Sequence, residues 1–241
     1  PYFALEYIDG RPLGEHCEAT GADIETRVRL LIEVAEALAY AHRRNVIHRD
    51  IKPSNILVSS DGHVKLLDFG IAKLLKGESG PTLTQQRVGP MTPEYAAPEQ
   101  FRGGDLSAAT DIYQFGVLLF RLLAGRLPYR ANAEDGLAWA RAVSEQEPLS
   151  LTSALRDARR AASAGMQSGE VTLRRFALRR GTDLDAIVRR CLAKEPGARY
   201  PSMDALIADL QAYLAPAAAR RPRWRRSGLA AACVAAALAL A

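Results

Sequence analysis

Cysteine is scarce in this chain of 241 residues, and the cysteines that occur form no pattern. There are three of them, Cys17, Cys191 and Cys233, and no two have the short spacing of metal ligands. A disulfide framework and a cysteine-based zinc site are therefore excluded, and a reducing, cytoplasmic compartment is expected for the folded part. We expect Cys191, on the apolar face of a helix, to lie in the core.

The chain also lacks an excess of charge outside one short segment. Its formal net charge is +5, but five arginines fall within residues 220–226, "RRPRWRR". Without them the net charge is about zero, so the basic balance belongs to this segment and no nucleic-acid partner is expected. His16, His42 and His63 show no partner pattern and are interpreted as surface or helix residues.

Long hydrophobic runs are absent until the last residues. Residues 228–241 are 14 uncharged residues that follow a basic segment, 216–227. A membrane span needs about 20 apolar residues. We expect the start of a single-pass transmembrane helix, with the arginines and Trp224 at the cytoplasmic face of the inner membrane. An Ala-rich packing helix or a low-complexity tail is the alternative.

A secretory signal is also missing, and the first residue is Pro1 rather than Met. We therefore expect a fragment whose N-terminus lies upstream. The first residues, Pro1–Ile8, have the composition of a strand that Asp9-Gly10 would end. Apolar residues then recur with helical spacing over Ile24–His42, where Asp23 is the expected cap.

Beyond that helix, Ile56–Val58 and Val64–Leu67 are expected to form two short strands around the turn "SSDG". Asp111–Leu123 is apolar almost all round and should be a buried helix opened by Asp111. Ile71–Gln100 is interpreted as a long loop and Arg156–Arg180 as a solvated basic insertion. The expected fold class is α+β, mainly α. Three further helices are expected, over Leu137–Val143, Asp183–Leu192 and Met203–Leu214.

The most informative stretch is "VIHRDIKPSNILV", Val46–Val58, where polar residues stand between two apolar runs. Buried polar groups cost free energy unless they find partners, so this is either a plain surface loop or a set of residues kept for chemistry. Asn55 precedes the first strand of the expected hairpin and Asp68 follows the second, so both should meet at its open end. Their oxygens suit Mg²⁺.

Asp50 and Lys52 lie on the same tight loop, so a carboxylate, an ammonium group and a metal site are expected to converge. Phosphoryl transfer needs such a set: a group that orients the nucleophile and cations that offset the charge of the phosphate.

These residues resemble the motifs of protein kinases. His48-Arg49-Asp50, Lys52 and Asn55 are similar to the catalytic loop H-R-D-x-K-x-x-N. Asp68-Phe69-Gly70 resembles the metal-binding D-F-G, and Ala97-Pro98-Glu99 the A-P-E motif. The resemblance covers about Tyr2 to Leu214, in the same order and spacing, and points to the bacterial, membrane-anchored, eukaryotic-like Ser/Thr kinases.

The resemblance implies a role for each of these residues. Asp50 would orient the attacking hydroxyl more than abstract its proton, because an ordinary carboxylate is a weak base at neutral pH. Lys52 would contact the γ-phosphate, and Asn55 and Asp68 would hold the metal.

The nucleotide and regulatory roles are implied in the same way. The adenine would contact Leu5, Glu6 and Ile8 at the hinge and Leu57 beneath it. Regulatory or structural roles are implied for His48, Phe69 and Gly70. Arg49 would pair with a phosphothreonine at position 82 or 84 (Thr82 or Thr84), and Thr92 would position the substrate. Asp111 would anchor the backbone of His48-Arg49, and Glu99 and Arg199 would form an ion pair.

The departures from the family are as informative. No G-x-G-x-x-G occurs, and no V-A-I-K lysine precedes the hinge. Residues 1–215 are therefore expected to hold the hinge strand, the catalytic hairpin and the helical bundle of the large C-lobe, without the small N-lobe that covers ATP. We expect residues 1–241 alone to be inactive and the full-length parent to be active.

The expected function is transfer of the ATP γ-phosphate to Ser or Thr hydroxyls of protein substrates, in bacterial transmembrane signalling. ATP and Mg²⁺, with Mn²⁺ as a substitute, are the implied cofactors, and a homodimer would allow trans-autophosphorylation. The alternatives are a pseudokinase scaffold that binds partners without transfer, and a small-molecule phosphotransferase.

Overall fold

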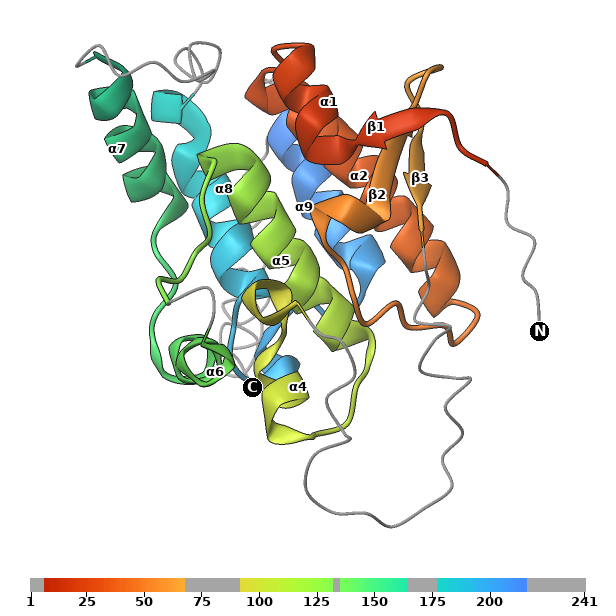
Figure 1. Cartoon of the computed structure of the whole chain (residues 1–241), viewed down its shortest axis with the longest axis vertical. Helices are drawn as coiled ribbons and strands as arrows, with labels where there is room; N and C mark the ends of the chain where they lie inside the picture. Colours follow the sequence, from red (N-terminus) through yellow and green to blue (C-terminus); the bar gives the residue numbers. More distant parts are fainter. Residues whose placement is uncertain (1–6, 68–91, 132–134, 164–176, 216–241) are drawn as a thin grey trace, which may run out of the picture.

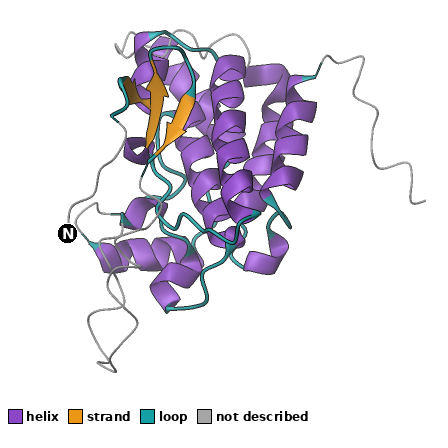
Figure 2. Cartoon of the chain, turned by 90° about the vertical axis from the view of Figure 1, so that its right-hand side faces the viewer, coloured by secondary structure: helices purple, strands orange, loops and turns teal. Residues whose placement is uncertain are grey.

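The computed structural model describes residues 7–67, 92–131, 135–163 and 177–215. Helices dominate, and a small antiparallel sheet lies at one side of them (Figure 1, Figure 2). The α-helices are α1 (Leu13–Ala19), α2 (Ile24–His42), α4 (Pro98–Arg102), α5 (Ala108–Ala124), α6 (Gly136–Glu145), α7 (Leu151–Ser163), α8 (Ala177–Cys191) and α9 (Met203–Leu214). The strands are β1 (Gly10–Pro12), β2 (Ile56–Ser59) and β3 (Val64–Leu66), and the short 3₁₀ turns include η1 (Pro53–Asn55) and η2 (Pro93–Tyr95).

The mainly helical α+β architecture agrees with the fold class predicted from the sequence. Helix α2 has the predicted bounds, and its N-cap is Asp23, whose Oδ1 accepts a hydrogen bond from Thr26 N at 2.8 Å. The side-chain acceptor satisfies one of the backbone N–H groups left free at a helix start. The predicted hairpin is also present, as β2 paired antiparallel with β3.

The N-terminal strand prediction is wrong for the part that the structure describes. Tyr7–Asp9 has no regular structure, and the strand β1 begins at Gly10, where the sequence suggested an end. Glycine is suited to this place because a Cβ there would lie 2.7 Å from the Val58 carbonyl oxygen of β2. Residues 1–6 lie outside the described part.

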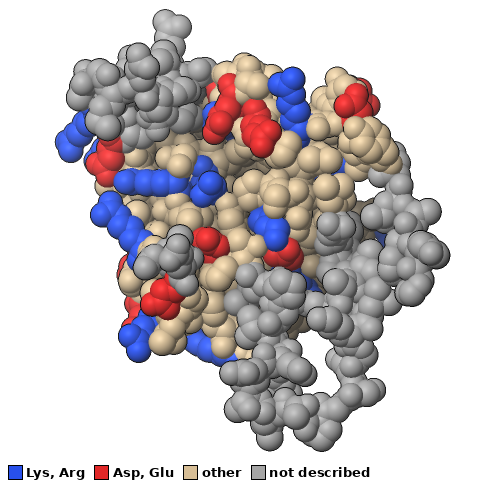
Figure 3. Space-filling view, in the orientation of Figure 1, with Lys and Arg blue, Asp and Glu red and all other residues tan. Residues whose placement is uncertain are grey.

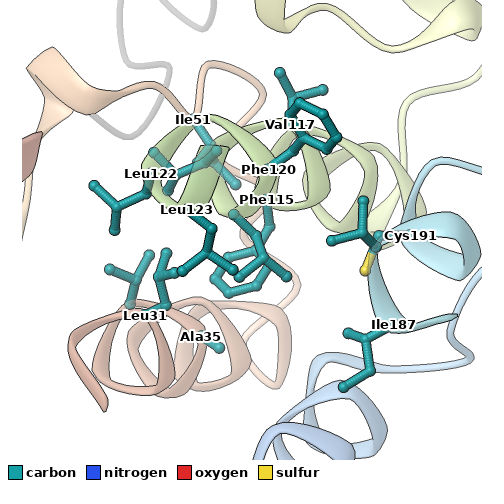
Figure 4. Packing of buried hydrophobic residues seen from close by; sticks show 14 of the residues in the cluster. Leu31, Ala35, Ile51, Phe115, Val117, Phe120, Leu122, Leu123, Ile187 and Cys191 are labelled. Atoms are coloured by element: carbon teal, nitrogen blue, oxygen red, sulfur yellow. The ribbon is translucent and has the colours of Figure 1, made fainter. Parts of the chain in front are cut away.

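Helix α5 forms the centre of the bundle. Nearly all of its side chains are buried, and it packs against α2, α7 and α8. In Figure 4, Leu31 and Ala35 of α2 lie below Phe115 of α5, with Cys191 of α8 to one side. Cys191 is fully buried, as predicted, and burial raises the pKa of its thiol far above the ordinary value.

Close contact between α5 and α8 depends on Gly116. A Cβ at this position would lie 2.5 Å from the Cβ of Cys191, a separation that side chains do not tolerate. The helix backbones can therefore approach each other only with glycine here. This close packing against α8 places the first turns of α5 next to the loop around His48.

Three other predictions need correction. Helix α5 begins at Ala108, capped by Ser107, so Asp111 lies one turn inside the helix and does not open it. The predicted long loop contains the helix α4 from Pro98 onward; its part 71–91 lies outside the described residues. The predicted insertion begins within α7 and ends within α8.

Helices α7 and α8 pack against each other, which explains why this part of the predicted insertion is ordered. Asp185 of α8 caps the start of α7, because its Oδ1 accepts hydrogen bonds from Ser150 Oγ at 3.0 Å and Leu151 N at 2.6 Å. Leu151 and Ala154 are fully buried. The basic residues around Arg156 concealed this short apolar face in the sequence.

Candidate functional site

Four polar side chains converge at the loop that precedes the hairpin. Lys52 Nζ lies 2.9 Å from Asp50 Oδ2. Asn55 Nδ2 donates to the Asp50 carbonyl at 2.8 Å and to Asp50 Oδ2 at 3.1 Å. Lys52 Nζ also donates to Thr92 Oγ1 at 2.9 Å, although 40 positions separate the two residues. A carboxylate, an ammonium group, an amide and a hydroxyl thus share one site.

The turn η1 places Asn55 for this contact. Pro53 is its first residue, and Asn55 N donates to the Lys52 carbonyl at 3.0 Å. The chain then enters β2 directly, so the side chain of Asn55 stays beside Asp50. Because Asn55 Nδ2 is already used by Asp50, its Oδ1 is left as an acceptor.

That Oδ1 fits one ligand position of a hard divalent cation, which takes carboxylate and amide oxygens. The second predicted ligand, Asp68, lies outside the described residues, as do Phe69 and Gly70. Within the described ranges, no group of three or more His, Cys, Asp or Glu side chains is arranged to hold a metal ion. The assignment of Asp68 as the second metal ligand therefore stays a prediction.

His48 ties the loop to the end of the hairpin. Its Nδ1 accepts a hydrogen bond from Asp50 N at 3.3 Å, so Nε2 carries the proton and donates to the Leu67 carbonyl at 2.9 Å. Leu67 N in turn donates to the Asn55 carbonyl at 2.8 Å. The hairpin end at Leu67 is thus fixed to both His48 and Asn55.

Asp111 of α5 holds the backbone of the same loop from below. Its side chain is fully buried, its Oδ2 accepts from His48 N and its Oδ1 accepts from Arg49 N, both at 2.8 Å. His42 is the last residue of α2, as interpreted from the sequence, and its Nε2 lies 2.7 Å from Asp111 Oδ2, a partner that the sequence did not predict. The buried carboxylate of Asp111 is therefore surrounded by three donors.

Arg49 has an unusual backbone conformation, with a positive φ of 69°. For a residue other than glycine, the left-handed region costs about 1–3 kcal/mol. Its N–H is bound by Asp111, and its carbonyl accepts from Gln100 Nε2 at 3.1 Å and Gln114 Nε2 at 3.0 Å. The neighbouring Ile51 N donates to Gln114 Oε1 at 2.9 Å. The surrounding side chains therefore determine this strained conformation.

Neither of these glutamines was predicted from the sequence to belong to the site. Gln114 is 1% exposed in the middle of α5, and it also donates to Gln100 Oε1 at 2.8 Å. Gln100 in α4 closes the network, because its Oε1 accepts from Ala97 N. The only signal in the sequence is an amide among apolar residues on a helix that is buried on all sides.

We expect Gln114→Ala to destabilise the fold by about 1–3 kcal/mol, because Ile51 N would lose its acceptor and the Arg49 carbonyl one of its donors. The expected loss of activity in the parent protein exceeds what the stability change explains, because the loop that carries Asp50 would relax. Denaturant unfolding together with kcat at a temperature well below the transition would measure both.

Gln146→Ala is a matched control for this prediction. Gln146 follows α6 and is exposed, so its replacement should change neither quantity. Unchanged kcat and stability in Gln114→Ala would show that the glutamine network does not hold the loop.

Glu99 and Arg199 form a buried ion pair beneath this region. Arg199 Nη1 lies 2.7 Å from Glu99 Oε1, and Arg199 Nη2 donates to Oε2 at 2.8 Å. Burial opposes ionisation of Glu99, but the hydrogen bonds and charge of Arg199, with a hydrogen bond from Thr110, lower the pKa of this carboxyl below its ordinary value. The pair joins α4, α5 and the segment before α9.

The predicted nucleotide contacts are only partly within the described structure. Leu57 is the middle of β2, opposite Pro12 of β1, and is half-buried. Ile8 is half-buried in the segment before β1. Leu5 and Glu6 lie outside the described residues, as do the predicted phosphosites Thr82 and Thr84. Their roles stay predictions.

Comparison with known proteins agrees with the geometry. A family model described as "Protein kinase domain" matches residues 1–210. A probable serine/threonine-protein kinase of Streptomyces coelicolor, SCO3848, is 33% identical over 215 residues, which are 89% of this chain and 28% of the relative. The serine/threonine-protein kinase PknB of Mycobacterium tuberculosis is 31% identical over 211 residues, 87% of this chain and 30% of PknB.

A third relative, the serine/threonine-protein kinase pkn3 of Myxococcus xanthus, is 35% identical over 217 residues, which are 88% of this chain and 36% of pkn3. The chain thus spans about a third of the length of these relatives.

Proposed function

The chain belongs to the protein kinase family, as a bacterial eukaryotic-like Ser/Thr kinase, and from that premise we propose that its parent protein transfers the γ-phosphate of ATP to Ser or Thr hydroxyls of protein substrates. The observation that carries this proposal is the convergence of Asp50, Lys52, Asn55 and Thr92 at one site. These residues supply a hydroxyl-orienting carboxylate, a cation for the phosphate and a metal-ligating amide.

In this proposal each described residue of the site has a defined task. Asp50 accepts a hydrogen bond from the substrate hydroxyl and turns its oxygen toward the phosphorus. Lys52, between Asp50 and Thr92, offsets charge on the transferred phosphoryl group. Thr92 holds the Lys52 ammonium and offers a contact to the substrate backbone. Positioning and electrostatic stabilisation of this kind supply most of the rate acceleration in phosphoryl transfer.

Asn55 and Asp68 are proposed as the ligands of a divalent cation, Mg²⁺ or Mn²⁺, and Leu5, Glu6, Ile8 and Leu57 as the adenine contacts. The free Oδ1 of Asn55 supports the first assignment. When bound, the cation neutralises charge on the phosphates of ATP. The family membership supports the use of ATP and of a divalent cation.

We further propose that a phosphothreonine at position 82 or 84 pairs with Arg49. Two features of Arg49 support this assignment. Its Nε is buried, and no described residue accepts a hydrogen bond from it. A guanidinium group with a free donor suits a phosphate, which accepts two parallel hydrogen bonds.

The proposed setting is signalling at the inner membrane. Residues 1–215 would lie in the cytoplasm, 216–227 would lie beside the membrane and 228–241 would begin a membrane-spanning helix. In a homodimer, one copy would phosphorylate the other. The five arginines of 220–226 and the uncharged run after them support the tether. No helix among residues 7–67, 92–131, 135–163 and 177–215 is long and apolar enough to cross a membrane. Membrane fractionation of the parent with and without 228–241 tests the tether.

A transfer assay on the full-length parent tests the function. We expect ATP-dependent phosphorylation of Ser or Thr in a generic protein substrate, detected by mass spectrometry, and its loss on removal of divalent cations with EDTA. Nucleotide binding without transfer would favour the pseudokinase scaffold. Transfer to aminoglycosides or other small alcohols, but not to proteins, would favour a small-molecule phosphotransferase. Residues 1–241 alone are expected to be inactive.

A further inference from the structure

An open cavity lies beside η2, the turn that directly follows Thr92. Its volume is about 510 Å³, and it is lined by the end of α5, the segment that follows it, α6 and η2. None of the residues given a role above lines it. The arrangement of α4, α5 and α6 around this region is seen in Figure 1.

The cavity is within reach of a substrate bound at Asp50. Glu94, one of its lining residues, is only two positions from Thr92, which accepts the hydrogen bond from Lys52. Two residues of chain span at most about 7 Å. A polypeptide that places a hydroxyl at Asp50 could therefore reach the cavity within about two to five residues.

The charge of the lining is mainly positive. The lining contains three arginines, Arg121, Arg126 and Arg130, and a single carboxylate, that of Glu94. Arg126 is paired with Asp157 at 3.0 Å, but Arg121 and Arg130 are exposed and form no ion pair with any described residue. On the face shown in Figure 3 the two signs are interspersed among the described atoms. The cavity therefore has a local excess of guanidinium groups.

Buried polar atoms of the lining also lack partners within the described part of the chain. Trp139 is 2% exposed, and its indole Nε1 has no acceptor. Arg126 Nε is likewise a buried donor without an acceptor, and Glu94 Oε2 a buried acceptor without a donor. Buried polar groups in folded proteins are normally hydrogen-bonded, so these three need a partner that is not among the described residues.

One kind of molecule satisfies both sets of groups. A carboxylate side chain accepts from guanidinium and indole N–H groups and can bind a guanidinium through two parallel hydrogen bonds. The backbone N–H of an extended peptide supplies the donor that Glu94 lacks. An acidic peptide therefore fits the cavity better than a free anion without a proton, such as sulfate, which has no donor for Glu94.

We propose that this cavity binds an Asp or Glu side chain of the polypeptide substrate, two to five residues from the phosphorylated hydroxyl. The inference rests on the proposed function, because it assigns the substrate class of that same site. Arg121 and Arg130 supply the charge for recognition, and Trp139 and Arg126 supply buried donors.

Paired peptides test the proposal on the full-length parent. Each pair shares one Ser and differs only in Glu or Gln at positions two to five on either side of it. We expect kcat/KM to be about three- to tenfold higher for the Glu member at the productive position, and a labelled Glu peptide to bind correspondingly more tightly in an anisotropy titration. The double variant Arg121→Ala with Arg130→Ala should lose this preference.

Charge reversal sharpens the test. Arg121→Glu with Arg130→Glu should prefer a Lys peptide to the Glu peptide, the reverse of the order expected for the wild type. Arg29→Ala is the matched control, because Arg29 is an exposed arginine of α2 that does not line the cavity. Its preference should equal that of the wild type.

The outcomes separate this inference from the proposed function. Equal kcat/KM for all Glu and Gln pairs would overturn the cavity assignment and leave the transfer activity standing. Selective binding of the Glu peptide without transfer would support the cavity and overturn the function. Tighter binding of the Glu peptide that appears only after deletion of residues 71–91, which keeps Asp68, would mean that the chain itself fills the cavity, and this result would also overturn the substrate assignment.

Discussion

Replacing Asp50 with Asn in the parent protein should lower kcat by about 10³-fold, within the 10²–10⁴ range of a positioned acid–base group. The Asp50 carboxylate binds Lys52 Nζ and Asn55 Nδ2 through Oδ2. An amide in its place can keep one of these contacts but loses the negative charge that orients a hydroxyl proton and holds the Lys52 ammonium. KM for ATP should change little, because Asp50 is not among the proposed nucleotide contacts.

Steady-state kinetics at saturating ATP and peptide would measure this effect. Thermal unfolding of the same variant should lie close to that of the wild type, since Asn nearly matches Asp in size and the site is partly exposed. Asp105→Asn is the matched control, at an exposed carboxylate in the loop before α5. A kcat within a few-fold of the wild type would exclude Asp50 from the reaction.

The elements that the sequence predicted best are those whose signal is local. Helix α2 could be predicted to its ends because its apolar spacing and its Asp23 cap both lie within the helix. The hairpin of β2 and β3 depends on a turn between two short apolar runs. Helix α7 was missed because its buried face is short and its stabilising cap, Asp185, comes from another helix.

The site follows the same rule. Asp50, Lys52 and Asn55 lie within six positions of one another, so a spacing pattern could identify them. Gln114 contacts the Arg49 carbonyl across 65 positions, and His42 contacts Asp111 across 69. Nothing in the local sequence around Gln114 or His42 distinguishes a residue that holds the loop in place from an ordinary helix residue. Such contacts arise only when tertiary packing brings α2, α5 and the loop together.

These long-range contacts explain how the loop keeps a strained conformation. The positive φ of Arg49 costs free energy. Four hydrogen bonds between the backbone of residues 48–49 and the side chains of Asp111, Gln100 and Gln114 offset this cost. The helix bundle thus holds Asp50 in place indirectly. Stability of the bundle and geometry of the site are therefore coupled, and the ion pair beneath α4 is where this coupling can be tested.

Arg199→Met should destabilise the fold by about 3–5 kcal/mol, because it leaves the Glu99 carboxylate buried without its cation. Arg199 is 3% exposed, and its guanidinium also donates to the carbonyls of Ala193, Ala109 and Lys194. Methionine keeps most of the volume but none of these hydrogen bonds. Against a typical total stability of about 5–15 kcal/mol, the loss is large enough to measure by denaturant unfolding.

The effect of pH identifies the ion pair as the cause. In the wild type the pKa of Glu99 is lowered, so the stability from this group is present above the unfolded-state pKa and is lost as pH falls through the folded-state pKa. In Arg199→Met the burial of Glu99 is opposed only by the hydrogen bonds from its own backbone and from Thr110, so burial raises the pKa of Glu99 and this variant gains stability from that group as pH falls from neutrality.

The difference in unfolding free energy between wild type and Arg199→Met should therefore narrow as pH falls from 7 toward about 4. Arg43→Met is the matched control, since Arg43 forms an exposed pair with Asp204 and its replacement should cost about 0–1 kcal/mol. A difference that stays constant with pH would attribute the destabilisation to the lost carbonyl contacts of Arg199, and the buried charge of Glu99 would then play no part in it.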